Sequence, residues 1–389
     1  EWSDTGLLAA VAREVVPVLS EAGQAPCFWI IDDTGYRKYG KHSVGVARQY
    51  CGQLGKTENC QVAVSLSLAT VEGSVPLDYR LYLPAEWAED KRRCKRAGVP
   101  KEIAFATKGE IAWAQIEAAL AAGIPRGTVL MDAGYGDEAA LRDRLSEHGL
   151  PYAVGIKPAT AVWWEEHQPA SAPVKQGRGR RRTRVLRDET HQPIGVRELA
   201  QGLPSAIYRT ITWREGTNAP LSSRFALVRV RAAHGDRPRE EEWLLIEWPK
   251  GELEPTRYFL STVSADISFK DLVATVKMRW RIERDYLELK QEVGLDHYEG
   301  RNWRGFHHHA SLCIAAYGFL MLERLCGSKK NSARLQAPSL PEGFQARGAR
   351  PDAAPHPLVD RHHTLSSGKG HRPRPVSVPL LRKTLFQGK

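Results

Sequence analysis

Cysteine and methionine are scarce in this 389-residue chain, which contains six of the first and three of the second. No two cysteines form a CxxC pair, and their scatter argues against both a disulfide framework and a zinc ribbon. Isolated thiols of this kind suit a reducing compartment. We therefore expect a cytoplasmic protein whose cysteines are buried or incidental.

Long apolar runs and targeting signals are also missing. The longest apolar run, residues 312–322, is too short to cross a bilayer. No charged-then-apolar leader opens the chain, which disfavours secretion. We expect no membrane contact. No internal repeat of 20–50 residues is visible, so a repeat architecture is not expected.

Positive charge, in contrast, is in excess and unevenly placed. The 56 Lys and Arg outnumber the 45 Asp and Glu, a formal net charge of +11 that suggests a polyanionic partner such as nucleic acid. Residues 328–389 hold 12 cations against 3 acids, and residues 175–187 hold 7 cations and no acid. The remainder is slightly acidic, so we expect a carboxylate-lined body with basic DNA-holding segments.

Apolar runs alternate with amphipathic stretches in the first part of the chain. We expect strands at 27–33, 43–50, 59–70, 74–84, 128–132 and 151–156, and helices at 5–20, 107–122 and 137–148. Thr107 and Glu110 form a capping box, and Asp137 is a candidate cap for the helix after it. This order indicates an α/β fold, a mixed sheet flanked by helices with its working edge at strand C-termini.

The pattern changes from about residue 158. Strand-like segments follow at 206–213, 223–232 and 241–248, and long helical patterns at 268–293 and 306–325. The Pro-, Gly-, Arg- and Ser-rich end of the chain predicts a flexible basic tail. We therefore divide the chain into a core first part (1–157), a β-rich insertion (158–255), a helical second part of the core (256–327) and the tail (328–389).

Three acids lie where a metal site needs them. Asp32 ends the first apolar strand, Asp132 ends a later one, and Glu283 lies in a strong helical pattern. If the two strands are neighbours, both aspartates emerge at one sheet edge, and a helical glutamate completes a set of oxygen ligands for Mg²⁺ or Mn²⁺. Two such ions support phosphoryl transfer. Taken singly, each acid is more often a cap or turn former than a metal ligand, and spacing alone does not make the three specific.

The helix around Glu283 carries two cations on the same face. At 100° per residue, Arg279, Glu283 and Lys290 fall within roughly 40° of one another. Such a stripe is either an ordinary ion-pair face or a metal ligand whose neighbours hold DNA phosphates. The residues by themselves leave both interpretations open.

This stripe resembles a signature of the bacterial insertion-sequence transposases of the DDE type, Tyr-x2-Arg-x3-Glu-x6-Lys. Arg279, Glu283 and Lys290 match its spacing, whereas Val276 stands at the tyrosine position. We expect Tyr286 to lie off that helix face and not to replace the tyrosine. Residues 31–61 and 129–136 are similar to the family's blocks around its two aspartates, and the resemblance covers about residues 1–325.

The resemblance implies an RNase H-like catalytic core with a β-rich insertion between the second aspartate and the glutamate. By motif match, Asp32, Asp132 and Glu283 are the catalytic and metal-binding residues for two Mg²⁺ or Mn²⁺ ions, with Asp33 a rival for the first place. Arg279 and Lys290 are the expected contacts to the terminal phosphates of the element. The implied activity is metal-dependent DNA cleavage and strand transfer at insertion-sequence ends.

The resemblance also implies partners. These are double-stranded DNA, as terminal inverted repeats and target, and a second copy of the chain, because two ends must be synapsed. A bacterial, nucleoid-associated location follows. Relatives usually begin with a helical DNA-binding region; this sequence begins at Glu1 without one, so we expect a truncated form.

Four other features have alternative interpretations. The run His307–His309 favours helix packing or DNA backbone contact over metal binding, because no ligand partner lies at suitable spacing. Trp163 and Trp164 favour the core over base stacking, and residues 91–96 favour a solvated helix face. The basic tract favours DNA contact over a solvated loop. Its candidate DNA-binding residues are Arg178, Arg180, Arg181 and Arg182.

Two rivals to the transposase hypothesis remain. One is a metal-dependent nuclease without transfer activity. The other is a catalytically inactive DNA-binding remnant or regulator of transposition. Cleavage and binding assays with and without divalent metal separate the three.

Overall fold

The computed structural model describes residues 3–22, 27–164, 191–215, 219–236 and 239–335. Residues 1–336 group into one compact unit. The basic tract at 175–187 lies outside the described residues, as does nearly all of the predicted tail, so those two predictions stay predictions.

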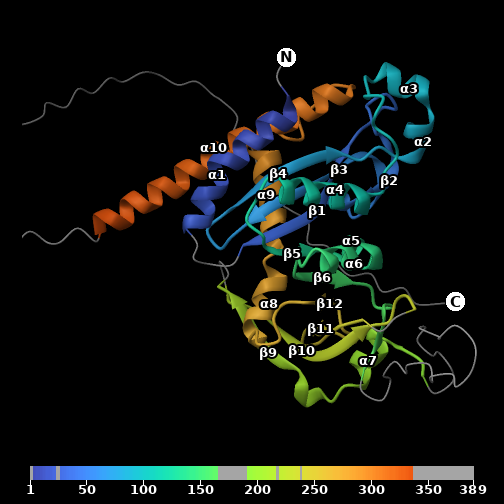
Figure 1. Ribbon diagram of the computed structural model, residues 1–389, viewed down its shortest axis with the longest axis vertical. Coiled ribbons are helices and arrows are strands. Elements are labelled where there is room, and N and C mark those ends of the chain that lie inside the picture. The colour runs from blue at the N-terminus through green and yellow to red at the C-terminus, as the bar shows by residue number, and fades with distance from the viewer. Residues whose placement is uncertain (1–2, 23–26, 165–190, 216–218, 237–238, 336–389) are drawn as a thin grey trace, which may run out of the picture. The chain divides into compact units, whose positions relative to one another are not determined.

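Twelve strands form one mixed sheet in the described part of the chain (Figure 1). They are β1 (Phe28–Arg37), β2 (Ala47–Cys51), β3 (Lys56–Ala69), β4 (Ser74–Leu81), β5 (Thr128–Met131), β6 (Tyr152–Ile156), β7 (Ala161–Trp163), β8 (Ile194–Gly195), β9 (Arg209–Arg214), β10 (Leu221–Ala232), β11 (Glu241–Glu247) and β12 (Arg257–Ser261). The strand order is β2-β3-β1-β5-β6-β12-β11-β10-β7-β8, with β4 paired to β3 and β9 to β10.

The centre of the sheet is parallel and its flanks are antiparallel. β5 pairs in parallel with both β1 and β6, whereas β3 and β12 run antiparallel to their neighbours. The strands of the 158–255 segment continue the sheet beyond β12. This arrangement confirms the predicted α/β fold with a mixed sheet flanked by helices, while the proposed domain boundaries stay a prediction.

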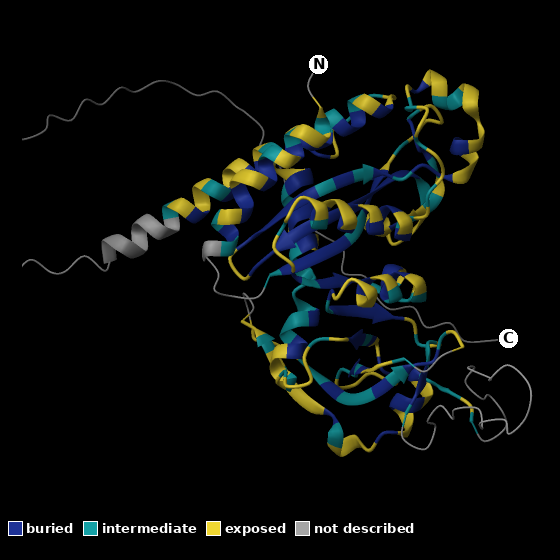
Figure 2. Ribbon diagram, in the orientation of Figure 1, coloured by how far each residue is buried: buried dark blue, intermediate teal, exposed yellow. Residues whose placement is uncertain are grey.

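Helices cover the sheet at several places. The longer ones are α1 (Asp4–Ala22), α4 (Lys108–Ala121), α6 (Ala139–Glu147), α8 (Phe269–Lys277), α9 (Trp280–Gln291) and α10 (Trp303–Leu335). The shorter ones are α2 (Ala85–Glu89), α3 (Lys91–Arg96), α5 (Ala133–Gly136) and α7 (Val196–Gly202). α1 and α10 pack on each other and on β4, and α4 packs on β3 (Figure 1). Figure 2 shows the central strands buried and the outer faces of α1, α4 and α10 exposed.

β1 is longer than the sequence predicts. The two acids do not end the strand, because β3 pairs with it along its whole length, from Phe28↔Ala69 to Arg37↔Cys60. The parallel pairing with β5 stops earlier, at Ile30↔Leu130. The acids therefore lie inside an extended strand, just beyond the point where one of its two partners leaves it.

The helix predicted at 268–293 is two helices, α8 and α9. Between them the backbone tightens: Arg281 and Ile282 donate to the carbonyl groups three residues before them, Met278 and Arg279. Such i→i+3 bonds inside a helical stretch mark a local change to 3₁₀ geometry. Arg279 thus lies at the start of α9.

Two local predictions at helix starts had opposite outcomes. The capping box of α4 is confirmed, since the Thr107 hydroxyl accepts the Glu110 N–H and the Glu110 carboxylate accepts the Thr107 N–H. The expected cap at Asp137 is wrong. Its carboxylate accepts the Thr160 hydroxyl at 2.6 Å, and α6 begins after Glu138 without a side-chain cap.

By length and composition alone, Trp303–Gly327 of α10 qualifies as a membrane span. Buried side chains of this stretch, among them Ile314 and Tyr317, belong to the hydrophobic core. α10 is therefore part of the core packing. A long apolar helix in a protein core has the same length and composition as a membrane span. Trp163 is 1% exposed and confirms the core interpretation of that residue.

Candidate active site

Asp32 lies in β1 and Asp132 directly follows β5, the parallel strand next to it. Ile30 of β1 lies opposite Leu130 of β5, and each aspartate follows two residues later. The predicted convergence of the two aspartates at one sheet edge rests on this pairing. β5 ends at Met131, and Asp132 begins α5, its Oδ1 accepting the backbone N–H of Gly134 at 2.8 Å.

α9 completes the site from above the sheet edge. Asp32, Asp132, Arg279, Glu283 and Lys290 all line one open cavity of about 480 Å³. The sequence-predicted residues that lie in described parts of the chain are thus brought together. The four arginines of the basic tract lie outside the described residues.

Arg279 bridges two of the three acids. Its Nη1 donates to Asp32 Oδ2 at 2.7 Å, and its Nη2 donates to Glu283 Oε1 at 2.6 Å. The Asp32 side chain is 14% exposed and that of Glu283 63%. The guanidinium therefore connects a buried carboxylate to one at the cavity mouth, and the ion-pair interpretation of this helix face holds for Arg279 and Glu283.

Asp32 is held in an environment that disfavours its charge. Burial raises the pKa of Asp32 to about 7, the positive charge of Arg279 acts against that shift, and the nearby charge of Asp132 adds to it. A carboxyl group whose pKa lies near neutral pH, in a cavity with a second carboxylate, is typical of functional sites. Asp132 is therefore close enough to Asp32 to influence its ionisation.

Asp33 has different partners from Asp32. Its Oδ2 accepts Lys108 Nζ at 2.9 Å and the Tyr135 hydroxyl at 3.0 Å. Consecutive strand residues point to opposite faces, which explains the split. Asp33 also lines the cavity, but Asp32 contacts Arg279, and the charge of Asp132 raises the pKa of Asp32. The two aspartates therefore line the same cavity with separate hydrogen-bond partners.

Lys290 faces inward in this structure. Its Nζ donates to the Gly35 carbonyl at 2.8 Å and to Gln53 Oε1 at 3.1 Å. Burial lowers the pKa of Lys290 to about 8. The lysine is 6% exposed, so a phosphate contact would require it to give up these partners.

Tyr286 is a cavity residue that the sequence reasoning placed wrongly. It lines the cavity and its hydroxyl lies 2.8 Å from Ser65 Oγ. Seven residues after Arg279, it is only about 20° from it on the helix, so the expectation that it lies off that face is wrong. Val276, at the signature tyrosine position, is buried. The helical spacing of Tyr286 from Arg279 is a sequence signal that points to this residue. No sequence signal points to Tyr135 or Lys108, which contact Asp33.

The donor chemistry of the cavity fits a divalent cation of the Mg²⁺ type. Its acids supply hard oxygen atoms, and Asp132 Oδ2 and Glu283 Oε2 accept no hydrogen bond from the described residues. No group of three or more His, Cys, Asp or Glu side chains in the described ranges stands close enough to hold an ion together. The expected convergence of Asp32, Asp132 and Glu283 within shared-metal reach is therefore wrong for this structure, in which the Arg279 guanidinium lies between Asp32 and Glu283.

The histidine run serves packing. His307 is buried, and its Nε2 accepts the Leu81 backbone N–H at 3.2 Å. His309 Nε2 lies 2.9 Å from the Gly294 carbonyl oxygen. These contacts confirm the packing interpretation.

Comparison with known proteins gives two findings. The family model described as "DDE superfamily endonuclease" matches residues 1–220, more than half of the chain, which includes both aspartates and ends before Glu283. The chain is also 36% identical over 135 residues to the "Probable transposase for insertion sequence element IS701" of Microchaete diplosiphon. That match takes 34% of this chain and 32% of the relative, so the chain spans about a third of that protein's length. On the family match, the chain belongs to the DDE superfamily endonucleases.

Proposed function

We propose that this chain cleaves DNA strands at insertion-sequence ends and joins them to target DNA. Asp32, Asp132 and Glu283 are the proposed catalytic carboxylates. The observation that carries the proposal is that Asp32 in β1 and Asp132 directly after the parallel neighbour β5 line one cavity with Glu283 of α9. Family membership supports the endonuclease activity.

The three acids would together provide the protein ligands of two Mg²⁺ or Mn²⁺ ions. Such ions, when bound, activate water and stabilise the leaving oxygen of a phosphodiester. Asp32 is a buried anchor, and Asp132 is oriented by the backbone N–H groups of α5. The Glu283 side chain is 63% exposed and is held by Arg279, so it would adjust once Arg279 moves to a phosphate.

Arg279 has a double role in this proposal. In the absence of ions it neutralises Asp32 and Glu283, which otherwise repel each other and Asp132. A guanidinium binds phosphate with the same two-pronged geometry that it uses for carboxylates. Arg279 is therefore suited to transfer from the acids to a DNA phosphate as the acids take up cations. Lys290 is the second proposed phosphate contact.

The test is a cleavage assay on duplex DNA that carries the terminal repeat flanking the chain's own coding sequence. It is run with Mg²⁺, with Mn²⁺ and with chelator, and Mn²⁺ binding is measured separately by calorimetry. Glu283→Gln is compared with Glu292→Gln, an exposed residue at the end of the same helix that does not line the cavity. We expect Glu283→Gln to lose cleavage and weaken Mn²⁺ binding while Glu292→Gln keeps both.

Other outcomes distinguish the rivals. Cleavage without joined products indicates a nuclease that lacks transfer. DNA binding with no cleavage in either metal indicates a regulator or remnant. Full cleavage by Glu283→Gln would reject the carboxylate set itself. Because two ends must be held together, we also propose that a homodimer acts on the DNA, and sedimentation of the protein–DNA complex tests this.

A further inference from the structure

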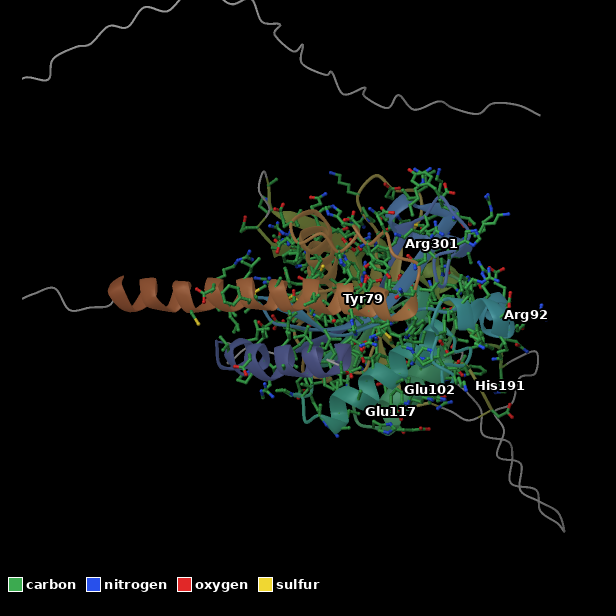
Figure 3. All side chains as sticks on the ribbon, turned by 90° about the horizontal axis from the view of Figure 1, so that it is seen from above. Tyr79, Arg92, Glu102, Glu117, His191 and Arg301 are labelled. Carbon is green, nitrogen blue, oxygen red and sulfur yellow. The ribbon has the colours of Figure 1, made fainter. Side chains whose placement is uncertain are left out.

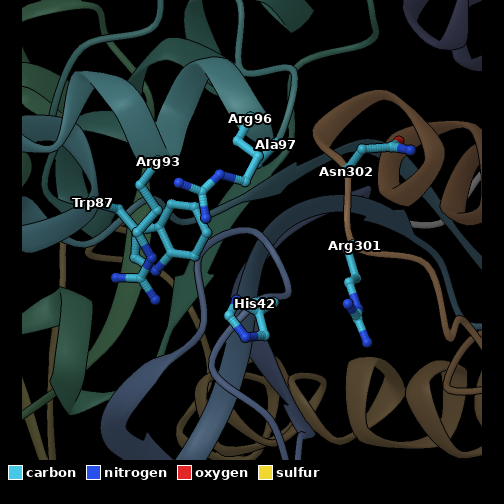
Figure 4. Close-up of a pocket in the computed structure, with 7 residues that line it drawn as sticks. All are labelled: His42, Trp87, Arg93, Arg96, Ala97, Arg301 and Asn302. Atoms are coloured by element: carbon cyan, nitrogen blue, oxygen red, sulfur yellow. The ribbon is translucent and has the colours of Figure 1, made fainter.

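A second cavity, separate from the acids, is lined by cations. It has a volume of about 470 Å³ and is lined by His42, Trp87, Arg93, Arg96, Ala97, Arg301 and Asn302 (Figure 4). No carboxylate of the described residues lines it, and the nearest ion-pair partner of its cations is Glu86, whose Oε1 lies 4.0 Å from Arg93 Nη1. The cavity therefore concentrates positive charge in a concave site.

Three chain segments build this cavity, and backbone hydrogen bonds join them. The Val44 N–H donates to the Arg301 carbonyl, which joins the loop after β1 to the loop before α10. The Trp303 N–H donates to the Ala97 carbonyl, which joins the latter loop to the end of α3. The arginines thus come from segments far apart in sequence but fixed to one another, so their convergence is built into the fold.

The cavity has a rigid wall and free donors. Arg93 stacks on the Trp87 ring at 3.7 Å and donates to the Lys41 carbonyl at 2.8 Å. The Trp87 indole N–H donates to the Val46 carbonyl at 2.7 Å, which fixes the ring. Arg96 and Arg301 are exposed and make no side-chain hydrogen bond or ion pair with other described residues. Two guanidinium groups are therefore left to bind an anion.

Shared lining residues connect this cavity to the cavity of the acids. An intervening cavity of about 230 Å³ shares His42 and Arg301 with the basic cavity. It shares Asp296 with the cavity of the catalytic acids. Its lining is mixed, with Arg37 and Lys38 beside Asp296 and Glu299. The three cavities therefore adjoin through shared lining residues, and both cations and acids line the middle one.

We propose that the basic cavity binds a backbone phosphate of the DNA substrate, with Arg96 and Arg301 as its principal ligands. The proposal rests on the proposed function in that the ligand is the same DNA. Arginine is suited to this because its planar fork donates two hydrogen bonds to one phosphate. His42 and the Asn302 amide add donors at the same site. The contact carries no sequence information, so its role is to set the position of the duplex relative to the acids.

The experiment measures duplex binding by fluorescence anisotropy over a series of salt concentrations. Arg96→Ala/Arg301→Ala is compared with Arg92→Ala/Lys95→Ala, which removes the same charge from exposed positions of α3 that do not line the cavity. Figure 3 shows Arg92 at the outer edge of the molecule. Loss of one phosphate contact reduces the magnitude of the slope of log K against log salt by about 0.9. Near 0.1 M salt, this corresponds to an affinity about eightfold lower. We expect that loss for the cavity variant and little change for the control.

Equal losses in the two double variants would overturn the proposal, because long-range charge would then explain the binding. A calorimetric titration with inorganic phosphate separates the two sources of the anion. Phosphate binding that depends on Arg96 and Arg301, with unchanged DNA binding, would overturn DNA as the ligand. A wild-type protein that binds no duplex would overturn this inference and the proposed function together. Wild-type binding and cleavage with no specific effect of the cavity variant would overturn this inference alone.

Discussion

Arg279 Nη1 lies 2.7 Å from Asp32 Oδ2, although 247 residues separate the two in the chain. The pairing joins the central strand of the sheet to the helix that carries Glu283. A buried carboxylate needs a compensating charge or a proton, and here the protein supplies an internal cation. Arg279 therefore compensates the charge of Asp32, and in the proposed function it gives way when the acids take up metal.

Removing Arg279 tests this dependence. We expect Arg279→Ala to lower the free energy of unfolding by about 3 kcal/mol at pH 8, because it leaves a buried charge without its partner. The pKa of Asp32, already raised to about 7, should rise further, so the loss is smaller at pH 5, where Asp32 is protonated in the folded state. Urea unfolding at the two pH values measures both effects.

Arg284→Ala is the matched control for that variant. The exposed Arg284 pairs with Glu288 on the same helix, and a pair with a solvent-exposed partner contributes little to stability. An Arg279→Ala protein that is no less stable at pH 8 than Arg284→Ala would contradict the assigned role of the bridge.

Asp32 and Asp33 should separate by function. We expect Asp32→Asn to lose Mn²⁺ binding and cleavage with its fold intact. Asp33→Asn should keep Mn²⁺ binding but lose about 1–3 kcal/mol of stability, since its contacts to Lys108 and Tyr135 are weakened. Calorimetry with Mn²⁺ and thermal unfolding of both variants give the answer, and the reverse assignment predicts the opposite pattern.

Glu242 predicts a pH-dependent stability far from the acids. It is 3% exposed, burial raises its pKa to about 7, and the Tyr152 hydroxyl donates to it at 2.8 Å. Because the folded-state pKa lies above the ordinary value of 4.5, its contribution is fully present below about pH 4.5. It is lost as the pH rises through 7. Glu242→Gln should therefore gain roughly 3 kcal/mol relative to the wild type between pH 4 and pH 8.

Unfolding curves of Glu242→Gln across this pH range measure the effect. Glu241→Gln serves as the control, because it removes the same charge from a more exposed position on β11. A stability difference between Glu242→Gln and the wild type that stays constant with pH would show that Glu242 ionises in the folded protein as it does in the unfolded chain.

The capping box of α4 gives a prediction on stability alone. Thr107→Ala removes the hydroxyl that accepts the Glu110 N–H, and we expect a loss of about 1 kcal/mol. Thr107→Ser keeps the acceptor and should lose much less. Thermal unfolding of the two variants checks this, and equal losses would mean that the methyl group of the threonine, not its hydroxyl, stabilises the helix start.

Features that depend on neighbours in the sequence were predictable from the sequence. The alternation of strands and helices indicated the α/β fold, and the spacing of Thr107 and Glu110 predicted a cap that the structure contains. The position of Asp132 directly after a short apolar run also followed from local pattern. Hydrogen bonds within a few residues and the periodicity of burial determine such features, and both are present in the sequence itself.

Features that depend on distant partners were decided only by the tertiary structure. β1 continues past Asp32 because β3 pairs with it to Arg37, and no local signal specifies that partner. The bridge from Arg279 to Asp32 exists because α9 packs over the edge of β1. The basic cavity at Arg96 and Arg301 likewise arises only where two distant segments are joined by backbone bonds. Periodicity identifies the face a residue occupies, but only the packing of strands and helices decides which charge it meets there.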